Sequence, residues 1–162
     1  MKIVHAGSLL NDSENKTTRF GQQYAKMIKQ VTFELGPFPR GFHLVTGEVM
    51  RQLPEFPTVG MLNLFVQHTS CGLTINENCD PDVRHDLKTI MDRLVPDGDP
   101  AYRHRDEGPT DMSAHAKSSL VGASLNIPII NGHLALGIWQ GIYLCEFREH
   151  GGPRRIVATI MA

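Results

Sequence analysis

The 162-residue sequence has few cysteines, one tryptophan, almost no net charge and no long apolar run. Its three cysteines, Cys71, Cys79 and Cys145, are an odd number at wide spacings. This excludes a disulfide framework and a CxxC metal or redox pair, and it indicates a reducing, cytoplasmic compartment. A formal net charge of −1 excludes a polybasic protein that binds nucleic acid or anionic membranes through bulk electrostatics. No run approaches the ~18 apolar residues of a membrane helix, and no signal-peptide pattern opens the chain. We therefore expect neither a nucleic-acid nor a membrane partner.

The length points to one domain with a short extension before it. Residues 11–18 form a polar run without a hydrophobic period. Such composition is typical of a flexible or loosely attached arm. We therefore expect residues 1–27 to be an N-terminal extension and residues 28–162 to be a single domain.

Hydrophobic periodicity predicts a mixed α+β domain. Alternating apolar residues predict strands over 31–35, 61–67, 72–77 and 154–161, and Asn131-Gly132 predicts a hairpin turn between two further strands. Short helical character is expected over 46–53, and two main helices are expected, one capped by Asp80 with Pro81 at its first position and one over 110–122. A strand over 138–147 is apolar on both faces, so it is either central in the domain or covered by another subunit. We expect a mostly antiparallel sheet of about six to eight strands.

Histidine is the residue in excess, with eight copies, and two of them lie close to an aspartate. Asp111 and His115 are four residues apart, so a helix places both side chains on one face. A carboxylate and an imidazole so placed can share one divalent ion, and His104 in the preceding loop can fold back as a third ligand. The alternative is a helix N-terminus whose Asp111 offsets the helix dipole while His115 is solvated.

A second polar group lies at the ends of two strands. His68 continues the inward face of one predicted strand, and Glu77 continues the inward face of the next, close to Asn76. An imidazole and a carboxylate in such positions can form a general acid/base pair. The alternative is a strand-connecting turn whose polar groups are satisfied locally.

Other candidates have less support. Gln140 shares a predicted strand face with two isoleucines, so its amide either orients a ligand or secures a subunit contact. Lys117 lies about 200° around the helix from His115 and is either a solvated lysine or a phosphate ligand. Arg154 and Arg155 form either a phosphate clamp or surface charge. The chain has no Walker loop, no GxGxxG and no serine-hydrolase elbow.

Several segments occur in the order found in the YjbQ-like family, which residues 28–162 resemble. These segments are 41–46, 67–70, 76–84, 113–119 and 137–142, together with a signature from Ser124 through Ile127, Ile129, Gly132 and residues 137–140 to Glu146. The resemblance implies an α+β sandwich whose mostly antiparallel sheets pack around the threefold axis of a homotrimer. It also implies a secondary thiamine-phosphate synthase, which joins a hydroxymethylpyrimidine diphosphate to a thiazole phosphate and releases diphosphate.

The resemblance further implies a divalent metal ion near a histidine-rich cleft. We carry this expectation onto His104, Asp111 and His115, and the acid/base role onto His68 and Glu77. The candidates for binding a small phosphorylated substrate are Asn76, Gln140 and Arg155. Imidazole ligands favour Zn²⁺, whereas Mg²⁺ prefers oxygen ligands and suits diphosphate release, so the ion is Zn²⁺ or Mg²⁺.

Three functions remain open from the sequence. The first is the metal-assisted transferase. The second is a metal-dependent hydrolase of a small substrate. The third is a trimer that binds a ligand without turning it over.

Overall fold

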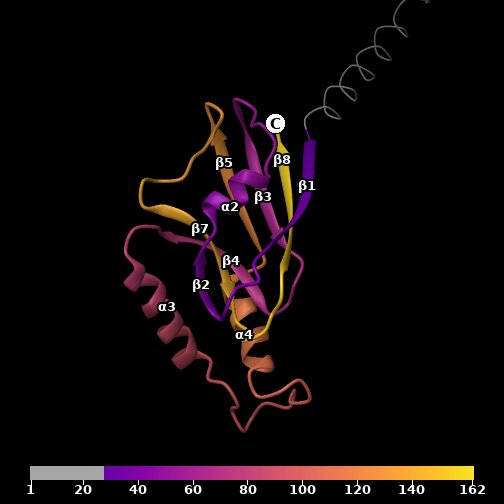
Figure 1. Cartoon of the computed structure of the whole chain (residues 1–162), viewed down its shortest axis with the longest axis vertical. Helices are drawn as coiled ribbons and strands as arrows, with labels where there is room; N and C mark the ends of the chain where they lie inside the picture. The colour runs from indigo at the N-terminus through magenta and orange to yellow at the C-terminus, as the bar shows by residue number, and fades with distance from the viewer. Residues whose placement is uncertain (1–27) are drawn as a thin grey trace, which may run out of the picture.

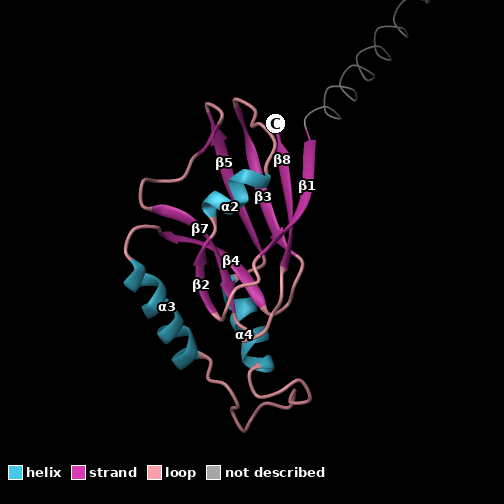
Figure 2. Cartoon of the chain, viewed as in Figure 1, coloured by secondary structure: helices cyan, strands magenta, loops and turns pink. Residues whose placement is uncertain are grey.

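The computed structural model describes residues 28–162, and the predicted extension, residues 1–27, lies outside the described residues. Two antiparallel sheets pack face to face, and two helices cover the outer side of the smaller one (Figures 1 and 2). The larger sheet has the strand order β1 (Ile28–Leu35), β8 (Arg154–Met161), β3 (Val59–Val66), β5 (Ser124–Ile130) and β6 (His133–Leu134). The smaller sheet has the order β2 (Gly41–Leu44), β7 (Gln140–Glu146) and β4 (Cys71–Glu77). The predicted α+β class with mostly antiparallel strands is confirmed.

The main core lies between the two sheets. Leu62, Leu64 and Val66 of β3 are fully buried there, as their alternation predicts. They pack with Ile142 and Leu144 of β7, which face them from the smaller sheet. The short helix α2 (Thr46–Gln52) adds one buried apolar side chain, Val49, to this core.

A second core lies between the smaller sheet and the helices. Tyr143, Cys145 and Phe147 point from the other face of β7 toward helices α3 (Pro81–Leu94) and α4 (Asp111–Val121). Strand β7 is therefore apolar on both faces because it is the central strand of a covered sheet. The prediction of a doubly buried strand is thus explained within one subunit.

The two predicted main helices form with the expected caps. Asp80 accepts a hydrogen bond from the amide of Asp82 and Pro81 occupies the first turn of α3, while Gly122 ends α4 with a φ of 100°. Among the described helices, none has the length and apolar character needed to span a membrane.

The predicted strand over 138–147 is too long at its start. Strand β7 begins at Gln140, and Ile138 and Trp139 lie in the preceding turn with 84% and 60% of their surface exposed. Gln140 is also exposed, and its side-chain oxygen accepts a hydrogen bond from the amide of Gly137 at 2.8 Å. The predicted strand face shared with Ile138 does not form, because Ile138 lies in the turn before β7, and the role of Gln140 in a ligand or subunit contact stays a prediction.

Candidate metal centre

Helix α4 carries two of the predicted ligands and is held tightly against strand β4. The Ser118 hydroxyl donates to the Cys71 carbonyl at 2.7 Å, and the Leu73 amide donates to the Gly122 carbonyl at 3.0 Å. A Cβ on Gly72 would lie 2.8 Å from the Gly122 oxygen, so only glycine allows this close approach. These contacts set the position of the whole helix relative to the smaller sheet.

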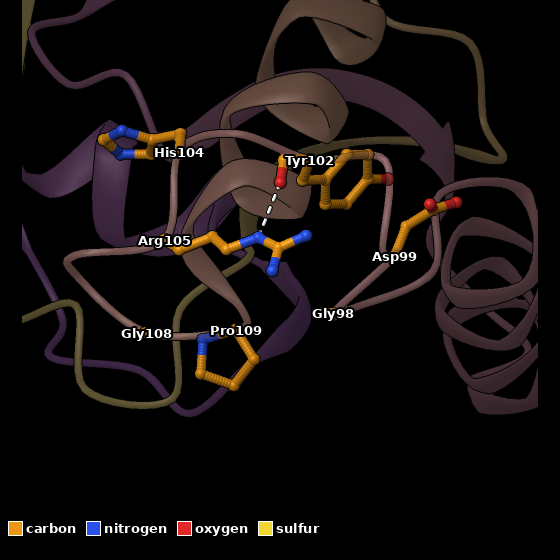
Figure 3. A pocket seen from close by; sticks show the side chains of 7 residues that line it. All are labelled: Gly98, Asp99, Tyr102, His104, Arg105, Gly108 and Pro109. Carbon is orange, nitrogen blue, oxygen red and sulfur yellow. Dashed lines mark hydrogen bonds between the residues drawn. The ribbon is translucent and has the colours of Figure 1, made fainter.

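The loop between α3 and α4 carries His104. Arg105 closes this loop by donating from Nε to the Tyr102 carbonyl at 2.6 Å and from Nη2 to the Pro100 carbonyl at 2.5 Å. The loop lines a cavity of about 280 Å³, in which the His104 ring points away from the Tyr102 and Arg105 side chains (Figure 3). The Arg105 guanidinium is therefore engaged in holding the loop.

Ion pairs and a hydrogen bond fix this loop and join helices α3 and α4 to each other. Asp97, at the start of the loop, binds Arg40 at 2.6 Å and accepts a hydrogen bond from the Ser113 hydroxyl of α4. Burial raises the pKa of Asp97, but the hydrogen bonds from Arg40 and Ser113 outweigh this effect and lower the pKa below its ordinary value. Lys117 is 1% exposed and its ammonium binds Asp92 of α3 at 2.6 Å. The solvated-lysine interpretation is therefore wrong, and its ammonium serves to join α4 to α3.

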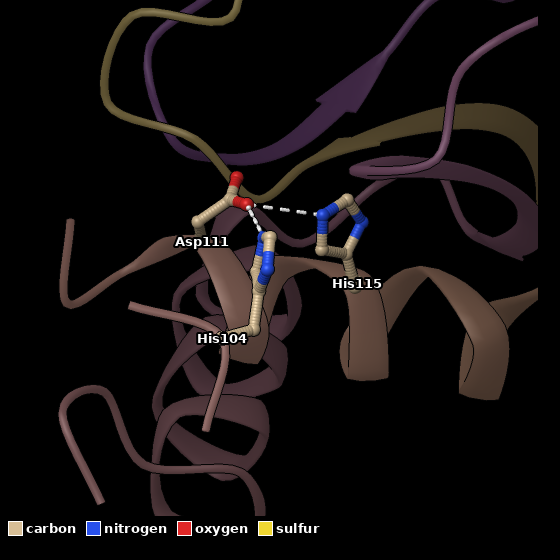
Figure 4. A group of neighbouring side chains, drawn as sticks. All are labelled: His104, Asp111 and His115. Carbon is tan, nitrogen blue, oxygen red and sulfur yellow. Dashed lines mark hydrogen bonds and ion pairs between the residues drawn. The ribbon is translucent and has the colours of Figure 1, made fainter. Parts of the chain in front are cut away.

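His104, Asp111 and His115 converge, as their spacing predicts (Figure 4). The Oδ2 atom of Asp111 lies 2.7 Å from Nε2 of His104 and 3.0 Å from Nε2 of His115. Asp111 is fully buried, whereas the His104 and His115 side chains are 42% and 32% exposed. The cluster thus has a buried carboxylate on one side and two partly exposed imidazoles that solvent can reach on the other.

A backbone contact determines which nitrogen of His115 carries a proton. Nδ1 of His115 lies 2.9 Å from the Thr69 carbonyl, which can only accept a hydrogen bond, so Nδ1 is protonated. In the neutral ring Nε2 then bears a lone pair, and this lone pair faces the Asp111 carboxylate. Two acceptors at 3.0 Å require a cation between or beside them, either a second ring proton or a metal ion.

The donor set fits a divalent transition metal. The three ligand atoms lie within 4.8 Å of one another, and the ligand atoms of a tetrahedral ion with bonds of about 2.0–2.2 Å lie ~3.4 Å apart. The observed spacings of 2.7 and 3.0 Å would have to open by about 0.7 and about 0.4 Å to reach that separation. The Thr69 carbonyl supplies the second contact that usually orients a metal-binding histidine.

His68 belongs to a neighbouring network and not to the ligand cluster. Its Nε2 accepts a hydrogen bond from the backbone amide of Arg155 at 2.9 Å, and its ring lies beside the buried Arg154 guanidinium. Burial and the charge of Arg154 lower the pKa of His68 below its ordinary value. Arg154 itself forms two hydrogen bonds of 2.6 Å with the buried carboxylate of Glu146. Of the paired arginines, it is therefore Arg154 that is buried, while the Arg155 side chain is exposed.

The predicted acid/base pair of His68 and Glu77 is wrong within one subunit. In the register of β4 and β7, Cys71 at the start of β4 lies opposite Glu146, and Glu77 at its end lies opposite Gln140. His68 precedes the start of β4, so His68 and Glu77 lie toward opposite ends of this strand. A seven-residue strand separates its ends by about 20 Å. The strand direction, which residue spacing alone does not reveal, places them far apart.

The predicted substrate residues are divided in the same way. Asn76 and Gln140 lie at the Glu77 end, where the Asn76 side-chain oxygen accepts a hydrogen bond from the Glu77 amide at 2.8 Å. Arg155 lies at the His68 end. One subunit therefore does not gather these three side chains around one ligand, and their binding roles remain predictions.

Sequence reasoning missed two groups at the cluster. Arg148 forms an ion pair with Oδ1 of Asp111, and the Thr69 carbonyl orients His115. A backbone carbonyl carries no signal in the residue type, and Arg148 is distant from Asp111 in the sequence.

Cys71, at the start of β4, is not a suitable nucleophile. Burial raises the pKa of its thiol to about 12, so the reactive thiolate does not form near neutral pH.

Comparison with known proteins places the chain among relatives of the same fold, which it covers over nearly their whole length. The family model "UPF0047 protein YjbQ-like" matches residues 30–162. The chain is 52% identical over 136 residues to UPF0047 protein YjbQ of Escherichia coli O157:H7, an alignment that covers 83% of this chain and 98% of that one. It is similar to the crystal structure of the conserved hypothetical protein TT1486 from Thermus thermophilus, with a TM-score of 0.70, 38% identity, and coverage of 78% of this chain and 97% of that one. An uncharacterised YjbQ/UPF0047 protein from Clostridium acetobutylicum aligns with a TM-score of 0.66 and 35% identity over 82% of this chain and 99% of that one. The chain therefore belongs to the YjbQ-like, UPF0047 family.

Proposed function

We propose that this protein is a metal-dependent enzyme that acts on a small phosphorylated substrate, with His104, Asp111 and His115 as the ligands of its ion. The observation that carries the proposal is the His115 ring, whose Nδ1 donates to the Thr69 carbonyl while Nε2 faces the Asp111 carboxylate. In the neutral ring, this arrangement directs the Nε2 lone pair toward the Asp111 carboxylate, where a metal ion would be bound, and not toward solvent.

The number and type of ligands favour catalysis over a structural role. Three protein ligands leave one position of a tetrahedral ion open, whereas structural sites close all four. Two nitrogens and one oxygen favour Zn²⁺ over Mg²⁺. The partial exposure of both imidazoles leaves room for a substrate to approach from solvent.

The specific reaction we propose to test first is the one that the family resemblance implies, the synthesis of thiamine phosphate. The thiazole nitrogen attacks the methylene carbon of the pyrimidine, a C–N bond forms, the C–O bond to diphosphate breaks, and diphosphate leaves with the electron pair. No proton is transferred in this exchange, so the separation of His68 and Glu77 does not oppose it. A divalent ion held by His104, Asp111 and His115 would supply positive charge to stabilise the departing diphosphate.

Hydrolysis of a small phosphate ester is the second candidate. The nitrogen-rich donor set favours it, because Zn²⁺ is common in hydrolases while diphosphate release more often uses Mg²⁺. A homotrimer and a cytoplasmic location are also part of the proposal. Light scattering tests the trimer, since a particle of 18.0 kDa would contradict it.

Metal analysis is the first experiment. The purified full chain should retain about one equivalent of zinc, and His115→Ala should lose it, while the control His133→Ala, an exposed histidine in the β5–β6 hairpin, should keep it. Equal metal content in the wild type and His115→Ala would refute the centre. The metal-loaded protein is then assayed with the two thiamine precursors and, separately, with simple phosphate monoesters. Product from the first supports the transferase, phosphate release from the second supports the hydrolase, and binding without turnover refutes both.

A further inference from the structure

Arg148 lies beside the ligand cluster and is not one of its ligands. It follows strand β7, and its Nη1 contacts Oδ1 of Asp111, the carboxylate oxygen that does not face the two imidazoles. Its second carboxylate neighbour is Oε2 of Glu107, at 3.7 Å on a side chain that is 65% exposed. The Arg148 side chain is itself 27% exposed. Part of the Arg148 side chain therefore remains exposed to solvent next to the proposed ion.

The backbone of Arg148 is held rigidly by a buried ion pair. Its amide donates to Oε1 of Glu146 at 2.9 Å, and the same carboxylate binds Arg154 through two hydrogen bonds of 2.6 Å. A Cβ on Gly151 would collide with Nη2 of Arg154, so the loop that carries Arg148 packs directly onto this pair. The backbone of Arg148 is consequently fixed before a ligand binds, and the ion pair with Asp111 holds the guanidinium in place.

The charges at the cluster call for an anion. Two neutral imidazoles, one carboxylate, a divalent ion and Arg148 sum to +2, which the exposed Glu107 offsets only in part. The imidazoles face Oδ2 of Asp111 and the guanidinium faces Oδ1 of the same carboxylate, so an ion held by the imidazoles would be a neighbour of the guanidinium. A tetrahedral oxyanion can present one oxygen to each of them, and a planar arginine fork is well suited to phosphate.

Three other cationic groups nearby have partners outside the ligand cluster, whereas Arg148 is paired with the ligand Asp111 itself. Arg154 is paired with Glu146, and Lys117 is paired with Asp92. Arg105 donates hydrogen bonds to two carbonyl oxygens of its own loop. We propose that Arg148 is the anion-binding residue of the His104–Asp111–His115 centre and holds a phosphate group of the substrate next to the metal ion. This inference rests on the proposed function and identifies the substrate group that meets the centre.

The test measures the binding of inorganic phosphate to the full chain loaded with one equivalent of zinc, by isothermal titration calorimetry, together with zinc content. Arg148→Gln should keep the zinc and weaken phosphate binding by ~10-fold or more, since it removes a charge-assisted hydrogen bond. Arg148→Lys, which keeps the charge but not the fork, should fall between. The matched control is Arg103→Gln, an exposed arginine in the His104 loop, which should bind phosphate as the wild type does.

Two results would overturn the inference. One is unchanged phosphate affinity in Arg148→Gln. The other is a parallel loss of zinc and phosphate in both Arg148 variants, because Arg148 would then act only by supporting Asp111. If the wild type holds no zinc, the proposed function fails by itself, and the same titrations on the metal-free proteins decide the role of Arg148. Circular dichroism confirms that each variant is folded.

Discussion

The first perturbation to make is Glu146→Gln, which breaks the buried ion pair behind the candidate centre without touching a proposed ligand. Glu146 is fully buried and accepts hydrogen bonds from Nε and Nη2 of Arg154 and from the Arg148 amide. Burial lowers the pKa of Arg154, but the hydrogen bond to Glu146 outweighs it and raises the pKa above its ordinary value. The variant thus leaves a buried cation without a charged partner, whose other side-chain contacts are the Ser70 hydroxyl and Nδ1 of His68, both at 3.3 Å.

Removing one member of a buried ion pair costs about 3–5 kcal/mol of unfolding free energy. In a chain of this size each kcal/mol lowers the melting temperature by about 2–4 °C, so Glu146→Gln should melt ~6–20 °C below the wild type. Urea unfolding followed by circular dichroism in metal-free buffer measures the cost directly. The control Glu55→Gln, at an exposed position, should change it by less than about 0.5 kcal/mol.

A double variant separates the ion pair from simple loss of packing. Glu146→Gln combined with Arg154→Met removes both charges, so it should be less destabilised than the sum of the two single variants. Costs that add without any coupling, or a cost for Glu146→Gln no larger than that of Glu55→Gln, would refute the reasoning. Phosphate binding should also weaken in Glu146→Gln, because the Arg148 backbone loses its anchor.

Three further predictions concern the surroundings of the centre. Gly72→Ala should push α4 away from β4, because the new Cβ would lie 2.8 Å from the Gly122 oxygen. We expect the unfolding free energy measured with urea to fall by about 1–3 kcal/mol and zinc to bind more weakly. Retained zinc affinity would contradict this. Burial raises the pKa of Asp92, but its lysine and arginine partners outweigh this and hold the pKa well below its ordinary value. As the pH falls below about 4, Asp92 is therefore protonated in the unfolded chain before it is protonated in the folded chain. Unfolding free energy should therefore drop from about pH 5 to about pH 3, and Asp92→Asn should flatten this slope; equal slopes would refute the assignment. The lowered pKa of His68 means that, below about pH 6.5, the unfolded chain binds a proton at this residue more readily than the folded chain does. The melting temperature of His68→Gln should therefore fall less between about pH 7.5 and about pH 5.5 than that of the wild type.

Local features of the chain predicted much of the fold. The Asp80–Pro81 start of α3, the Gly122 end of α4 and the Asn131-Gly132 turn depend on backbone preferences of a few adjacent residues. Asn131 and Gly132 adopt φ values of 52° and 77°, as such a turn requires. The alternation in β3 similarly identifies its buried face, because a strand reverses its side chains at every residue.

The ligand cluster was also within reach of sequence reasoning. Asp111 and His115 lie one helical turn apart, and His104 needs only a short loop to return to them. The spacing could not reveal the Thr69 carbonyl or Arg148, which come from the segments just before β4 and just after β7. Their approach depends on how α4 packs against the smaller sheet.

Sequence alone thus determined most of the elements, the buried face of β3 and the Asp111–His115 pair, because each depends on dihedral angles and periodicities within a few residues. Tertiary structure alone decided that His68 and Glu77 lie at opposite ends of β4, that Lys117 is buried against Asp92, and that Arg148 meets Asp111. Those contacts join residues far apart in the chain, and they follow from strand order and register, which the packing of the two sheets selects and no local pattern encodes.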